Sequence, residues 1–291
     1  MRILVTGSTG FIGSYLINYL LSENHEVIAT SRDISKAKKK KWYRSVKYIA
    51  FNIENIDESI NLYEKFHSPD VLIHLAWDGL PNFLDSIHIE KNLFFHYKFL
   101  KNYIISGGKQ VVCIGTCLEY GMENGCLSEE DIPKPNCAYA VAKDSLRRFI
   151  ENLQKDNNFI FQWVRLFYMY GEGQNSKSIL PQLELAVKNK NSIFDMSFGE
   201  QLRDYLSVET VAHNISKIAL QNKVTGIINC SAGVPISVRT LVENFILKNN
   251  YSIQLNLGFY PYPSYEPMAF WGDNRKLKTI SNEGPNFSFS R

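Results

Sequence analysis

Tyr139 and Lys143 have the spacing and the chemistry of a proton-transfer site. The two residues lie four positions apart in the segment YAVAK, which opens a predicted helix that ends near Leu153. Residues at i and i+4 share one face of a helix, so both can reach a common ligand. A phenol has a pKa of about 10, and a neighbouring ammonium favours its ionised form. The pair is therefore suited to exchanging a proton with an alcohol or ketone, but alone it is weak evidence because both residues are common on helix surfaces.

The first thirteen residues, MRILVTGSTGFIG, predict a dinucleotide site. Residues 3–5 are an apolar run typical of a central parallel strand, and Gly7, Gly10 and Gly13 follow it. Gly7 permits a tight turn, Gly10 lets a phosphate approach the backbone, and Gly13 lets the helix pack closely on the strand. Free N–H groups and the helix dipole then form a seat for a pyrophosphate. A purely structural turn is the alternative, but the position directly after a first strand favours the dinucleotide.

The end of the second expected strand, residues 25–31, indicates which dinucleotide binds. An NAD site places Asp or Glu there, whereas this chain has Ser31 and Arg32. A guanidinium stacks on adenine and pairs with a 2′-phosphate, so the sequence favours NADP(H). Asp33 lies one or two positions late and keeps NAD(H) possible.

The pattern of elements is α/β and predicts a Rossmann-type, doubly wound parallel sheet. Further strands are expected at residues 46–51, 70–75, 110–115, 159–165 and 226–230. Asn52 and Ile53 follow the third strand, where the adenine edge would lie. Ala76 and Trp77 follow the fourth strand, at the end where such sheets bind ligands, and Thr116 follows the fifth.

The regular alternation stops after the sixth strand, which predicts a smaller α/β substrate-binding region at the C-terminal side. We expect the NADP(H)-binding Rossmann domain to span 1–166, completed by 203–231, and the substrate-binding region to comprise 167–202 and 232–291. The polar residues from Asn282 onward are expected to fray.

A long helix is expected over residues 84–105, with more aromatic side chains than one buried face needs. Packing on the sheet is one explanation. We predict that this helix and the helix over 138–153 also form a homodimer interface, as a four-helix bundle.

The composition argues against other classes of function. A net charge of +3 over 291 residues is too small to indicate nucleic-acid binding, and no apolar run reaches the length of a membrane span. The five cysteines are odd in number and match no metal-ligand spacing. We therefore expect no metal and no membrane or nucleic-acid partner, with reduced thiols, no signal peptide and a cytoplasmic location.

The chain from Met1 to about Lys278 resembles the extended short-chain dehydrogenase/reductase family, the NAD-dependent epimerases and dehydratases of nucleotide sugars. The resemblance rests on TGSTGFIG, DVLIHLAW, GTCLEYG, YAVAK, RLFYMYGEGQ and RDYLSVETVA. The forms GTCLEYG, RLFYMYGEGQ and FWGDNRKLK are most similar to reductases of nucleotide-linked 4-keto-6-deoxysugars.

The resemblance implies a role for each site residue. Tyr139 would be the general acid/base, Lys143 its activator, and Thr116 the hydroxyl that orients the substrate oxygen. The cofactor would contact Gly7, Thr9, Gly10, Phe11, Ile12, Gly13, Ser31, Arg32, Asn52, Ile53, Leu75, Ala76, Trp77, Asn92, Tyr139, Lys143 and Phe167. The nucleotide-sugar substrate would contact Trp77, Cys117, Tyr168 and Arg203. Arg203 would hold the substrate pyrophosphate, and a surface ion pair with Asp204 is the alternative.

Departures from the family pattern narrow the reaction. Dehydratases carry Asp-Glu where this chain has Cys117 and Leu118, so dehydration is not expected. Epimerase-reductases use a cysteine at the position of Leu118 and a histidine after the sixth strand, but no histidine lies between His96 and His213. Epimerisation at C3 or C5 is therefore not expected either. Tyr168 replaces an Asn that often binds phosphate, which leaves the mode of phosphate binding open.

We therefore predict an enzyme that transfers hydride from NADPH to the C4 keto carbon of a dTDP- or CDP-linked 4-keto-6-deoxyhexose, for surface polysaccharide. Within the family, the alternative is a 4-epimerase of the UDP-galactose type that retains NAD. Among proteins that are not enzymes, the alternative is a non-catalytic NADP(H) sensor. The presence of Thr116, Tyr139 and Lys143 together counts against it, because a sensor does not need them.

Overall fold

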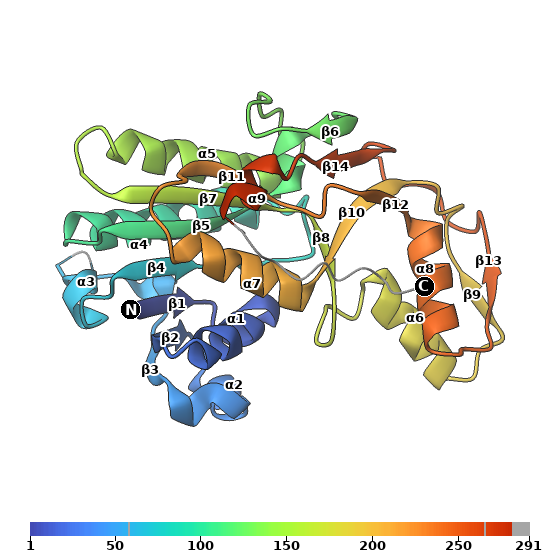
Figure 1. The fold of residues 1–291 in the computed structure, drawn as a ribbon, viewed down its shortest axis with the longest axis horizontal. Coiled ribbons are helices and arrows are strands. Elements are labelled where there is room, and N and C mark those ends of the chain that lie inside the picture. The colour runs from blue at the N-terminus through green and yellow to red at the C-terminus, as the bar shows by residue number, and fades with distance from the viewer. Residues whose placement is uncertain (58, 265, 281–291) are drawn as a thin grey trace.

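The computed structural model describes residues 1–57, 59–264 and 266–280, and its centre is a parallel sheet (Figure 1). Within these residues seven strands pair in the order β11-β7-β5-β4-β1-β2-β3, all parallel. The strands are β1 (Arg2–Thr6), β2 (Glu26–Ser31), β3 (Lys47–Ala50), β4 (Val71–His74), β5 (Gln110–Thr116), β7 (Ile160–Leu166) and β11 (Gly226–Cys230). The order reverses beside β1, so the expected Rossmann-type fold is confirmed, with its ligand crevice at the carboxyl ends of β1 and β4.

Helices cover both faces of this sheet because its strands are apolar on both sides. Ile3 and Val5 of β1 face a core shared with α1 (Phe11–Ser22), α7 (Val208–Ala219) and α9 (Arg275–Ile280). Leu4, between them, faces a second core with α3 (Leu62–Lys65), α4 (Leu93–Ile105) and α5 (Ala138–Leu153). The side chains of Ile3, Leu4 and Val5 are completely buried, so burial on both faces fixes the strand that precedes the glycine turn.

A smaller region lies beside the carboxyl ends of the strands, at one end of the molecule in Figure 1. Its strands are β8 (Tyr168–Tyr170), β10 (Leu202–Ser207) and β12 (Pro235–Ser237) in one sheet, and β9 (Ile193–Asp195) paired with β13 (Gln254–Asn256). Helices α6 (Ile179–Lys188) and α8 (Val238–Lys248) pack with Phe194 and Met196 into a core of their own. A third pair, β6 (Gly125–Leu127) with β14 (Phe270–Gly272), lies beside this region.

Short helical segments fill the connections. These are α2 (Ile34–Lys38), the 3-10 segments η1 (Lys41–Ser45), η2 (Ile53–Asn55) and η4 (Cys117–Tyr120), and the π-helical segment η3 (His88–Asn92).

Two details of the structure differ from the sequence-based expectation. The helix expected from residue 84 starts only with η3 and α4, because the Asp85 side chain accepts the Ile87 N–H at 3.0 Å and holds the preceding residues in turns. Strand β10 pairs with β8 and β12 and not with the central sheet, so only α7 and β11 of residues 203–231 return to it. The proposed domain boundaries remain a prediction, and the tail from Asn282 lies outside the described residues.

None of the described helices is long and apolar enough to cross a membrane. No group of three or more His, Cys, Asp or Glu side chains in the same part of the chain is arranged to hold a metal ion.

Candidate active site

The glycine turn between β1 and α1 has room and donors for a pyrophosphate. Gly7 has a φ of +64°, and a Cβ there would lie 2.8 Å from the backbone nitrogen of Ala76. A Cβ on Gly13 would lie 2.5 Å from the carbonyl oxygen of Gly7. Gly10 is the N-cap residue of α1 and has no side chain, so no N-cap side chain accepts the first N–H groups of this helix. Free amides, a helix dipole and the absence of side chains fit the phosphates of a dinucleotide.

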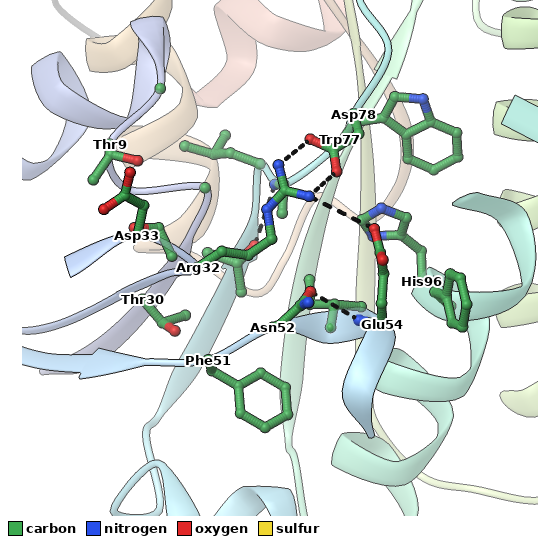
Figure 2. A pocket seen from close by; sticks show the side chains of 18 of the residues that line it. Thr9, Thr30, Arg32, Asp33, Phe51, Asn52, Glu54, Trp77, Asp78 and His96 are labelled. Carbon is green, nitrogen blue, oxygen red and sulfur yellow. Dashed lines mark hydrogen bonds and ion pairs between the residues drawn. The ribbon is translucent and has the colours of Figure 1, made fainter. Parts of the chain in front are cut away.

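A pocket of about 230 Å³ extends from this turn along the ends of β1 to β4 (Figure 2). Its lining includes Gly7, Thr9, Gly10, Ser31, Arg32, Asn52, Ile53, Leu75, Ala76, Trp77 and Asn92, all of them expected cofactor residues. Its walls come from the ends of neighbouring parallel strands, where the adenosine half of a dinucleotide would lie.

Arg32 lies across this pocket, held by two carboxylates (Figure 2). Its Nη1 lies 2.6 Å from Asp78 Oδ2 and 3.6 Å from Glu54 Oε1, and its Nη2 donates to Asp78 Oδ1 at 2.9 Å. Asp33, the residue that kept NAD possible, instead caps α2 by accepting the Ser35 and Lys36 N–H groups. Among the described residues, Arg32 is thus one of two cations, with Lys36, that line this pocket and that a 2′-phosphate would meet, but it already has acidic neighbours.

A second pocket, of about 460 Å³, shares Gly7, Gly10, Leu75 and Trp77 with the first. It brings together the three predicted catalytic residues, Thr116, Tyr139 and Lys143, from β5 and α5. The expected residues Phe11, Ile12, Gly13, Cys117, Phe167 and Tyr168 also line it. Segments far apart in the sequence thus meet beside the glycine turn.

Tyr139 is enclosed by aromatic rings. Its ring centroid lies 5.2 Å from that of His88, 5.6 Å from Phe83 and 6.0 Å from Trp77. Burial raises the pKa of the phenol above its usual range, and the charge of Glu119 raises it further. In the protein without ligands, desolvation of this enclosed ring therefore opposes the acidification of the phenol that the Lys143 ammonium favours.

Lys143 lies one turn further along α5 and is also buried. Its Nζ donates to the carbonyl oxygen of Ile114 at 2.8 Å and lies 3.9 Å from the centroid of the Trp77 ring. Burial lowers the pKa of Lys143 to about 8, although the charge of Glu119 acts against this. A lysine with this pKa is still largely charged at pH 7 and can stabilise negative charge that forms on a neighbouring oxygen.

Thr116 ends β5 and is positioned as a hydroxyl donor. Its Oγ1 accepts the N–H of Leu118 at 3.3 Å and so caps η4. A hydroxyl whose oxygen accepts one bond still has its proton to donate. Thr116 can therefore donate to a substrate oxygen that enters the pocket.

Arg203 is not among the residues that line either pocket. Its Nη2 donates to Glu266 Oε2 at 2.9 Å, and its Nη1 donates to the backbone carbonyls of Leu202 and Met268. Asp204, the alternative partner, instead accepts N–H groups of Ala232 and Gly233. Glu266 lines the second pocket, so the Arg203 guanidinium is paired with a carboxylate at the space where we expected the substrate.

Sequence reasoning missed Glu266, Asp78 and His88. Glu266 lies far along the chain in a segment without regular structure, and the sequence contains no signal that it would line the same pocket as Tyr139. His88 Nδ1 accepts the indole N–H of Trp77 at 3.1 Å, and His88 Nε2 donates to the carbonyl oxygen of Asn82 at 3.0 Å. Both ring nitrogens are thus engaged in holding the rings around Tyr139, and neither is left for proton transfer. His88 lies in a π-helical segment, a feature that often marks functional sites but that the sequence does not reveal.

The comparisons with known proteins agree with this fold. The NAD dependent epimerase/dehydratase family matches residues 3–231. The chain belongs to this family. It is 29% identical over 273 residues to dTDP-6-deoxy-L-talose 4-dehydrogenase (NAD(+)) of Aggregatibacter actinomycetemcomitans, with 94% of this chain and 99% of that one covered.

Two further similarities span most of the chain. The chain is 24% identical to dTDP-4-dehydro-6-deoxyglucose reductase of Escherichia coli, with 85% of this chain and 82% of that one covered. The crystal structure of a UDP-glucuronic acid 4-epimerase from Bacillus cereus, with UDP-glucuronic acid and NAD, superposes with a TM-score of 0.84 at 23% identity, covering 99% of this chain and 95% of that one. The fold is therefore shared by dehydrogenases, reductases and epimerases, and local chemistry must distinguish among them.

Proposed function

We propose that this chain reduces the C4 keto group of a dTDP- or CDP-linked 4-keto-6-deoxyhexose with NADPH. The observation that carries the proposal is that Thr116, Tyr139 and Lys143 line one pocket beside the glycine turn. The nicotinamide, when bound, supplies hydride to the keto carbon. Tyr139 donates a proton to the oxygen, Thr116 hydrogen-bonds the same oxygen, and Lys143 stabilises the negative charge left on the phenol.

The surroundings of this set support simple reduction. Burial raises the pKa of the Cys117 thiol, so Cys117 is a poor base for removing a proton beside the ketone. Leu118 has no ionisable group. The one carboxylate among the described lining residues of this pocket, Glu266, is held by Arg203. The names of two relatives, a dTDP-6-deoxy-L-talose 4-dehydrogenase and a dTDP-4-dehydro-6-deoxyglucose reductase, support a dTDP-linked 6-deoxysugar substrate. The CDP-linked alternative rests on the sequence resemblance.

A 4-epimerase is the second candidate, because the Bacillus cereus enzyme with the same fold is one. The cofactor content of the purified protein discriminates between the two. Protein that is empty after gel filtration and oxidises added NADPH with a 4-keto-6-deoxysugar nucleotide supports the reductase. Protein that retains NAD and interconverts 4-epimers without added cofactor supports the epimerase. A non-catalytic NADP(H) sensor would catalyse neither of these two reactions.

Arg32 supports the proposed preference for NADPH. Replacing it by Asp should lower the ratio of kcat/KM for NADPH to that for NADH by about 10- to 100-fold, because charge-assisted hydrogen bonds to the 2′-phosphate are lost. Steady-state kinetics with both cofactors measures this ratio. Arg44→Asp is the matched control, because Arg44 is exposed in η1 and lines neither pocket. Equal efficiency of the native enzyme with both cofactors would contradict the preference.

The outer faces of α4 and α5 support the proposed homodimer. Phe94 and Ile105 on α4 and Phe149 on α5 are 56%, 58% and 42% exposed, although all three are large and apolar. The Tyr97 ring of α4 lies 5.3 Å from Phe149, which joins part of this surface across the two helices. Sedimentation at micromolar concentration should give a dimer that Phe149→Lys dissociates. A native monomer at that concentration would refute the interface.

A further inference from the structure

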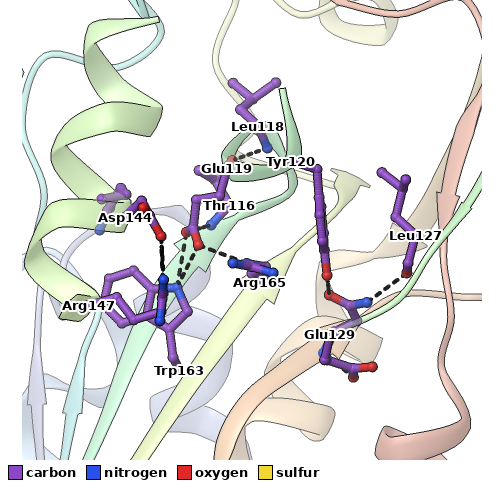
Figure 3. Close-up of polar contacts among 12 residues, drawn as sticks. Thr116, Leu118, Glu119, Tyr120, Leu127, Glu129, Asp144, Arg147, Trp163 and Arg165 are labelled. Atoms are coloured by element: carbon purple, nitrogen blue, oxygen red, sulfur yellow. Dashed lines mark hydrogen bonds and ion pairs between the residues drawn. The ribbon is translucent and has the colours of Figure 1, made fainter. Parts of the chain in front are cut away.

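Glu119 is a buried carboxylate with no exposed surface, three residues after Thr116 (Figure 3). Its Oε1 accepts the backbone N–H of Thr116 at 2.8 Å and the indole Nε1 of Trp163 at 3.0 Å. Its Oε2 accepts the same indole at 3.0 Å and the Arg165 Nε at 2.8 Å. Burial of a charge is costly unless it is paired and hydrogen-bonded, and every partner named here is a donor.

The Glu119 carboxylate is closely packed by the residues around it. A Cβ added to Gly115, the residue before Thr116, would come within 2.5 Å of Glu119 Oε1 and within 2.2 Å of Trp163 Nε1. On the other side, the Arg165 guanidinium lies over the Tyr120 ring at 4.3 Å from its centroid. Close packing on both sides therefore fixes the carboxylate relative to the end of β5.

We propose that Glu119 is a positioning residue that holds Thr116 in its working orientation, a role that rests on the proposed reductase function. The carboxylate fixes the backbone of Thr116, and the Thr116 Oγ1 in turn accepts the Leu118 N–H. Neither of these bonds uses the hydroxyl proton of Thr116, which can donate to the neighbouring Cys117 sulfur or to an oxygen that enters the pocket. Glu119 itself lines neither pocket and touches no reacting atom.

The charge of Glu119 gives this role a second, electrostatic signature. Its negative charge raises the pKa of Tyr139, and it offsets part of the lowering that burial causes in the pKa of Lys143. Both effects keep the two groups protonated to higher pH. Removing the charge should therefore move the alkaline limb of the reduction rate to lower pH, which a general loss of stability would not do.

The test compares Glu119→Gln with Glu129→Gln. Glu129 is a matched control, because its Oε1 also accepts a backbone N–H, that of Asn229, but it lines neither pocket (Figure 3). In E119Q the amide NH₂ must face one of the former donors, so kcat should fall about 10- to 100-fold with KM nearly unchanged. The alkaline limb should also shift to lower pH. E129Q should show neither change.

Hydrogen exchange makes the test independent of the reaction. The segment 111–120 should exchange faster in E119Q than in wild type, and other segments should not. If E119Q does not fold because Arg165 is left unpaired, E119Q/R165M removes both charges and should still show faster exchange in this segment and a lower kcat. Native exchange and native kcat in either folded variant would overturn the proposal. If wild type reduces no 4-keto substrate, the proposed function fails, while local exchange still decides whether Glu119 holds Thr116.

Discussion

Tyr139→Phe is expected to lower kcat by about 10² to 10⁴ while leaving cofactor affinity almost unchanged. The ring keeps its packing against His88, Phe83 and Trp77, and only the hydroxyl that donates the proton is lost. Steady-state turnover measures the first effect, and fluorescence titration with NADPH measures the second.

The control for this variant is Tyr63→Phe, which removes a phenol from α3 that lines neither pocket. It should turn over like the native enzyme. Near-native turnover by Tyr139→Phe would contradict the assignment and would move the proton donor elsewhere. Glu266 would then be examined before Cys117, because it carries a carboxylate into the same pocket while burial raises the pKa of the thiol.

Lys143→Met should impair both binding and turnover, by about 10² or more in kcat/KM. Methionine is one atom shorter and keeps the apolar packing beside Trp77, but it loses the ammonium that donates to Ile114 O. The expected outcome is weaker NADPH binding by titration together with a lower kcat. Lys101→Met, an exposed lysine on α4, should change neither.

The stability of Lys143→Met gives an independent readout. Because burial lowers the folded-state pKa of Lys143 to about 8, the unfolded chain binds its proton more tightly. The native protein therefore gains free energy of unfolding as pH rises from about 8 toward about 10.5, the usual lysine value, and the variant lacks this gain. Thermal melts across this range measure the difference. Native binding and turnover in the variant would contradict the role assigned to Lys143.

Local sequence patterns were sufficient to predict the central fold. The apolar run before Gly7, the glycine spacing and the repeated strand–helix alternation depend on neighbouring residues, and the structure confirms the parallel sheet that they predict. The same locality explains why Tyr139 and Lys143 could be recognised, since a helix places residues four apart on one face.

The rest of the site depends on contacts between distant segments. Glu266 reaches the pocket from an irregular segment, and Asp78 meets Arg32 only because β2 and β4 flank β1. The role expected for Arg203 assumed a free guanidinium, whereas its donors are used by Glu266 and two backbone carbonyls. The acidity of Tyr139 also depends on how completely other segments enclose its ring.

The most direct test of the proposed reaction is to run it in D₂O with NADPH and 4-keto-6-deoxysugar nucleotides and to read the product by NMR. Net reduction by the Thr116, Tyr139 and Lys143 set predicts hydrogen from NADPH at C4 and no deuterium at C3 or C5 above the non-enzymatic background. Deuterium at C3 or C5 would show that a base in the pocket removes a proton beside the ketone, with Glu266 the first candidate. A product without hydrogen transfer from NADPH to C4 would contradict the reductase itself.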